Sequence, residues 1–84
     1  LSEAAGIWVK GTITQSPRLE QDGYSIQVND KTYHIAAEAP VYKRFERRPG
    51  AYTEEKITIR DLHFGQEVSI RVHEGTILKI IVWE

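Results

Sequence analysis

The residues best suited to binding chemistry lie in one short segment, from Tyr42 to Tyr52. It contains four of the 11 basic residues and three of the 8 aromatic residues of the chain. Arginine and aromatic side chains together can stack on bases, pair with phosphates or bind carboxylates. The alternative is that Tyr42 and Phe45 pack onto the domain while the charges keep a long loop solvated. The candidate ligand-binding residues of this segment are Tyr42, Lys43, Arg44, Phe45, Arg47, Arg48 and Tyr52.

Trp8 is a further candidate, because it alternates with Lys10 and Thr12 on one face of an expected strand. An aromatic ring in that position can be a stacking platform, or it can cover a neighbouring strand. Both interpretations remain open from the sequence.

The remaining polar residues do not form the pattern of a catalytic or metal site. His34, His63 and His73 lack the close spacing of metal ligands, and His34 and His73 alternate with core residues and are expected to face solvent. No serine has the surroundings of a nucleophile, and the acidic residues are scattered. The sequence therefore predicts a protein that is not an enzyme and that needs neither a metal nor a cofactor.

Composition limits the chain to one small domain. Its 84 residues are 40% hydrophobic and include no cysteine, so a packed core and not disulfides must stabilise it. The net charge of -1 argues against a protein built mainly to hold nucleic acid or anionic lipid. No apolar run has the length of a transmembrane helix. The absence of methionine predicts a processed chain or a domain of a longer protein, with residues 1–6 as a linker and 7–84 as the domain.

Alternating apolar and polar residues predict strands in most of the chain. The first strand is expected over 7–15, where Ser16-Pro17 ends the pattern before a polar loop at 18–22. A hairpin over 24–35 should turn at Asn29-Asp30, and a final hairpin at Glu74-Gly75. In the last strand we expect two apolar faces, one with Ile77, Ile81 and Trp83 and the other with Leu78, Ile80 and Val82.

The segment from 36 to 56 allows two interpretations. Pro40 could begin a short helix that ends before Pro49-Gly50, with Val41 and Phe45 on one face. Equally, a short strand at 41–43 could precede an exposed loop.

These patterns predict an all-β protein, a small antiparallel barrel of five or six strands with, at most, one short helix near 40–48. The expected core consists of apolar residues at alternate positions in separate runs: Ile26, Val28, Ile35, Ile57, Ile59, Val68, Ile70, Val72 and Ile80.

Two motifs resemble those of small OB-like barrels. The segment from Asp61 to Val68 is similar to the barrel-closing turn of OB-like and SH3-like domains, in which Asp61 caps the turn, Leu62 and Phe64 plug the barrel and Gly65 restarts a strand. The segment from Val9 to Ile13 resembles a glycine-containing first strand. The whole is similar to barrel domains found beside S-layer homology modules in secreted bacterial envelope proteins, which implies a secreted or envelope location.

The sequence therefore favours a non-catalytic interaction or spacer module of a larger protein, whose partner is another domain or protein surface. The alternative function is an OB-type binder of single-stranded nucleic acid or another polyanion through residues 42–52.

Overall fold

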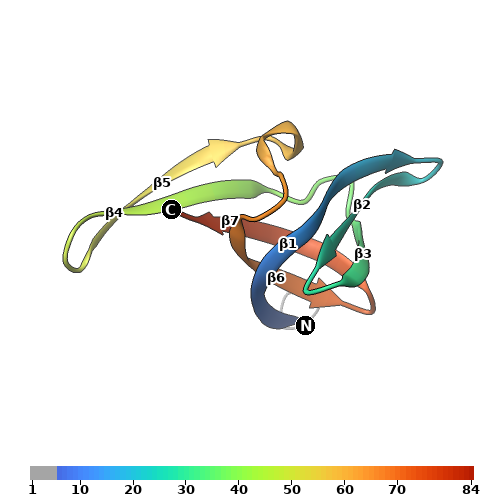
Figure 1. The fold of residues 1–84 in the computed structure, drawn as a ribbon, viewed down its shortest axis with the longest axis horizontal. Coiled ribbons are helices and arrows are strands. Elements are labelled where there is room, and N and C mark those ends of the chain that lie inside the picture. Colours follow the sequence, from blue (N-terminus) through green and yellow to red (C-terminus); the bar gives the residue numbers. More distant parts are fainter. Residues whose placement is uncertain (1–5) are drawn as a thin grey trace.

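The computed structural model describes residues 6–84 and shows an all-β protein, as predicted (Figure 1). The predicted linker, apart from Gly6, lies outside the described residues. One 3-10 helix (η2, Ile59–Asp61) accompanies the strands β1 (Ile7–Glu20), β2 (Gly23–Val28), β3 (Lys31–Ile35), β4 (Val41–Arg48), β5 (Ala51–Ile57), β6 (Glu67–His73) and β7 (Thr76–Trp83). Among residues 6–84, no helix has the length and apolar character to cross a membrane.

Five strands close a barrel in the order β1-β2-β3-β7-β6, with β6 returning to β1. The pairing of β3 with β7 is parallel, and the other four pairings of the barrel are antiparallel. The predicted barrel is thus confirmed, but its sheet is mixed and residues 6–84 form seven strands. The physical reason is that β3 and β4 run in the same direction along one edge of β7, β3 beside residues 76–77 and β4 beside 80–83.

The first strand belongs to both halves of the barrel. Residues 7–12 pair with β6, and residues 13–20 pair with β2. The predicted break at Ser16-Pro17 and the loop after it are wrong, because β1 continues to Glu20. Register shifts between Ile13 and Gln15 and between Gln15 and Arg18 each place an extra residue in β1. Pro17 lies in the second of these bulges, where a missing backbone N–H costs no ladder hydrogen bond.

Gly11 lies where β1 changes partner, and the turn between β2 and β3 packs directly on it. The Asn29 side chain accepts a hydrogen bond from the Thr12 N–H at 3.1 Å and donates one to the Lys10 carbonyl at 3.3 Å. Asn29 and Asp30 both have positive φ, as the two-residue turn requires. The Asn29 side-chain amide therefore makes the backbone hydrogen bonds on either side of Gly11 that a neighbouring strand would otherwise make.

Residues 41–57 form a long hairpin, so both the helix near 40–48 and the exposed loop are wrong. Val41 and Phe45 share a face in β4 because they are four residues apart, a spacing that fits a strand as well as a helix. Pro49-Gly50 makes the turn, with Gly50 at a φ of +82°. Figure 1 shows this hairpin projecting beyond the barrel, joined to it along β7.

The barrel interior is filled by apolar side chains, and among the described residues no polar side chain is buried. Of the predicted core, all but Ile57 and Ile59 are buried, and these two are partly buried against it. The predicted faces of β7 need one correction. Leu78 is an extra residue opposite the step from Arg71 to Val72, so Ile77 turns inward with Ile80 and Val82. Ile81 and Trp83 lie on the outer face.

The turn before β6 closes one end of the barrel. Asp61, predicted to cap a turn, accepts hydrogen bonds from the Thr58 N–H at 3.0 Å and hydroxyl at 3.3 Å and thereby caps η2. Leu62 is 3% exposed and forms the plug, whereas Phe64 is 71% exposed and does not. Gly65 has a φ of +95°.

Candidate interaction surface

The outer face of the sheet brings together aromatic and cationic side chains from four strands, with Ser69 from a fifth. Register places Trp8 and Lys10 of β1, Ser69 of β6 and Lys79, Ile81 and Trp83 of β7 on this face, because directly paired residues point to the same side. Tyr42 and Arg44 of β4 pair with Ile81 and Trp83, and Tyr52 of β5 follows. We call this set the outer patch: Trp8, Lys10, Tyr42, Arg44, Tyr52, Ser69, Lys79, Ile81 and Trp83.

Trp83 is the centre of the outer patch. Its indole N–H donates to the Ser69 hydroxyl at 2.8 Å, which fixes the ring on the sheet. The Lys10 ammonium lies 5.7 Å and the Arg44 guanidinium 5.1 Å from the ring centroid. Tyr52 meets the ring edge-on at a centroid distance of 6.3 Å. Both cations are therefore held by the quadrupole of one ring.

A third cation is held in the same way beside Trp83. The Lys79 ammonium lies 5.2 Å from the centre of the Tyr42 ring. Arg44 also forms an ion pair with Glu54 across the β4–β5 hairpin. The ammonium groups of Lys10 and Lys79 lie over rings, those of Trp83 and Tyr42. Glu67 pairs with Trp83 on the same face and shares a shallow hollow with Lys10, whereas Lys79 pairs with Arg71.

A shallow groove of about 350 Å³ runs between the two tryptophans. Its floor and walls come from Trp8, Arg44, Ser69, Lys79, Ile81 and Trp83. Ile81 is 5% exposed and makes the floor apolar, while Trp8 is 52% exposed and stands at one side. The groove thus has an apolar base, an exposed ring and cations at its margin, without a carboxylate in its lining.

The predicted binding residues divide between two surfaces. Tyr42, Arg44, Tyr52 and Trp8 lie in the outer patch. Lys43, Phe45 and Arg47 alternate with Tyr42 and Arg44 and belong to the opposite face of the β4–β5 hairpin. There the Arg47 guanidinium lies 5.9 Å from the Phe45 ring and its Nε donates to the Thr53 hydroxyl at 2.7 Å.

Arg48 is exposed beside the turn, where it pairs with Ala51. The eight candidates are therefore not one site. The sequence analysis placed Lys10 on one face with Trp8, but it missed Ser69, Lys79, Ile81 and Trp83 as companions of Trp8 and Arg44. The alternation around each of these residues was visible, but their convergence depends on which strands are neighbours.

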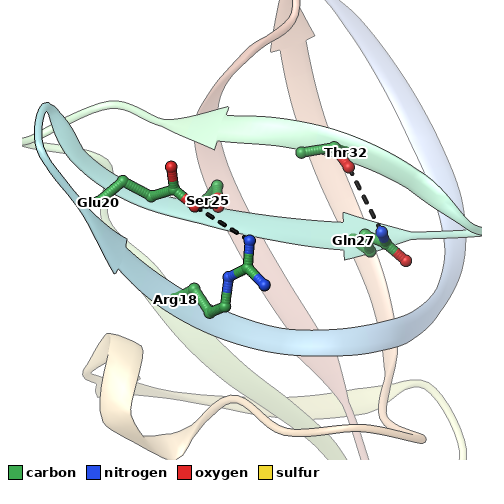
Figure 2. A network of polar contacts seen from close by, with 5 residues as sticks. All are labelled: Arg18, Glu20, Ser25, Gln27 and Thr32. Carbon is green, nitrogen blue, oxygen red and sulfur yellow. Dashed lines mark hydrogen bonds and ion pairs between the residues drawn. The ribbon is translucent and has the colours of Figure 1, made fainter.

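A second polar surface lies on the far side of the barrel and is internally satisfied. Figure 2 shows Arg18 and Ser25 both directed to the Glu20 carboxylate, at 3.3 and 3.2 Å. In the same view Gln27 donates to the Thr32 hydroxyl at 3.4 Å. Because these groups pair with one another, this surface offers a matched control for the outer patch.

His34 and His73 are exposed, as predicted, and His63 is exposed as well. Within residues 6–84, no three side chains of His, Asp or Glu gather closely enough to hold a metal ion. His73 lies 3.9 Å from the Glu74 carboxylate at the β6–β7 turn, and His63 contacts the Phe64 carbonyl. The sequence analysis assigned no functional role to His63 or His73, so these contacts test none of its predictions.

Comparison of the chain with models of protein families, with curated proteins and with solved structures found no significant match.

Proposed function

We propose that the chain is a non-catalytic interaction module that binds its partner through the outer patch. The supporting observation is the combination of an exposed Trp8, an apolar floor at Ile81 and cations held over rings. Interface residues that contribute most binding free energy are mainly tryptophan, tyrosine and arginine, which are also the types gathered here.

The closed interior of the barrel supports the same proposal. Its side chains are apolar and packed, so a ligand has to bind outside. In the outer patch, Trp83 is held by Ser69 and by two cations, so little side-chain entropy is lost when a partner binds.

We also propose the kind of protein to which this module belongs. The strand order and the segment from Asp61 to Val68 suit an OB-like barrel, and the resemblance to domains beside S-layer homology modules suggests a larger protein that is exported or held in a bacterial envelope. In that setting the partner is another domain or another protein.

Carbene footprinting of the intact parent protein in the cells that produce it tests this function. Labelling of Trp8 should fall severalfold relative to the isolated 84-residue chain, because a partner covers the outer patch. Leu19 is 73% exposed on the β1–β2 hairpin and is the internal control, whose labelling should not change. Equal labelling of Trp8 in both samples would reject the proposed function.

A further inference from the structure

We infer that the outer patch binds an acidic protein segment in which an apolar side chain is flanked by carboxylates. This inference rests on the proposed function and specifies the chemistry of the partner. Its basis is the geometry of the groove and the sign of the charges around it.

The groove accommodates the apolar side chain of the partner. Its volume of about 350 Å³ is near the low end for small-molecule pockets, and it is open along the sheet. Ile81 forms its floor and Trp8 and Trp83 its sides, so an inserted leucine or aromatic side chain would contact apolar surface on three sides. A partner side chain in this position would act as the anchor of the interface.

The cations around the groove favour carboxylates in the flanking residues of the partner. Lys10, Arg44 and Lys79 come from three different strands, and the groove lies among them. Glu54 compensates Arg44 only, through its ion pair. Carboxylates on either side of the anchor can therefore pair with Lys10 and Lys79, whose ammonium groups lie over the Trp83 and Tyr42 rings.

The charge of the whole chain favours a protein over a nucleic acid as the partner. The chain has 12 acidic and 11 basic residues, so it lacks the long-range positive field that draws a polyanion. Local complementarity of charge around an apolar anchor is enough for a protein partner.

Four synthetic peptides of 11 residues test the inference. Each has leucine or glycine at its centre, and each centre is flanked either by Asp and Glu or by Lys. Backbone amide shifts of the labelled chain, followed by NMR during titration, report both affinity and location. The acidic peptide with leucine should shift residues of the outer patch and bind at least about tenfold more tightly than the other three.

Variants of the chain make the same test from the protein side. Trp8→Ser with Lys79→Ser should abolish the shifts, whereas Arg18→Ser with Gln27→Ser, on the surface of Figure 2, should leave them unchanged. Lys10→Glu with Lys79→Glu should reverse the preference, so that the basic peptide with leucine binds best. A general loss of structure would not produce that reversal.

Two outcomes separate this inference from the proposed function. If oligothymidylate or polygalacturonate shifts the outer patch and the acidic leucine peptide does not, the inferred partner is wrong although the outer patch still binds. If all four peptides bind with equal affinity, neither the anchor nor the charge selects the partner, and the inference is also rejected. Footprinting of Trp8 in the parent protein tests the function independently of both results.

Discussion

Whether replacing Gly11 by alanine raises or lowers the free energy of unfolding should depend on Asn29. A Cβ atom at residue 11 would lie 2.3 to 2.5 Å from the amide atoms of the Asn29 side chain. Carbon atoms do not approach that closely, so in Gly11→Ala the amide has to move. It then loses its hydrogen bonds to the Thr12 N–H and the Lys10 carbonyl.

The magnitude follows from two opposing contributions. Each lost hydrogen bond removes about 0.5–1.5 kcal/mol of stability, or about 1–3 kcal/mol for both. Replacing a strand glycine by alanine restores about 0.5–1 kcal/mol through a smaller loss of backbone entropy. Gly11→Ala should therefore lower the free energy of unfolding by about 1 kcal/mol, the difference between the middle values of the two contributions.

In the Asn29→Gly background the same substitution should be stabilising. Glycine accepts the φ of +55° at residue 29, and both side-chain hydrogen bonds are already absent. Nothing then opposes the entropic gain, so Gly11→Ala should raise the free energy of unfolding by about 0.5–1 kcal/mol.

Urea unfolding of the four proteins, followed by circular dichroism, measures the coupling as a double-mutant cycle. The denaturant dependence should be the same in all four, since the surface exposed on unfolding hardly changes. An equal loss of stability in both backgrounds would refute the role given to Asn29.

Three further predictions concern the core and the arginines. Leu62→Ala should cost about 2–5 kcal/mol in urea unfolding, because it empties the barrel end, whereas Phe64→Ala should change stability by less than about 0.5 kcal/mol; equal effects would contradict the assignment of Leu62 as the plug. Ile70→Ala, in the centre of β6, should cost about 2–5 kcal/mol in the same assay, and a loss below about 1 kcal/mol would contradict its burial. Arg44→Ser should lower the free energy of unfolding by about 1–2 kcal/mol, because its contacts with Trp83 and Glu54 are lost. Arg48→Ser, at an exposed position, should change it by less than about 0.5 kcal/mol. Similar losses in both variants would count against the packing of Arg44.

The parts of the fold that depend on local pattern could be predicted from the sequence. Asn29-Asp30 and Glu74-Gly75 make the expected turns, since Asn, Asp and Gly are the residue types that accept positive φ most readily; Glu74 adopts a φ of +52° beside Gly75. Alternation also identified most of the core. Periodicity describes which residues share a face of one strand, and these strands are long enough to show it.

The parts that depend on distant neighbours could not be predicted. Whether 41–48 is helix or strand was decided by the free edge of β7, which lies about 40 residues further along the chain. The extra residue at Leu78, which turns Ile77 inward, follows from pairing with β6 and has no local signal. The outer patch was missed for the same reason, since Trp8 and Lys79 come together only after β6 is inserted between their strands.

The position of β7 between β6 on one edge and β3 and β4 on the other has a consequence for the order of folding. β7 is the last strand of the chain, and β1 pairs with β6 across 55 to 65 residues of sequence. Loop closure over that distance is slow compared with the formation of a hairpin. The β1–β2–β3 and β4–β5 segments can therefore form early as separate sheets, whereas the barrel is completed only when residues 67–83, which form β6 and β7, have left the ribosome. Until then the edges that β6 and β7 will occupy are open, and folding of this module during synthesis should be limited by its C-terminal hairpin.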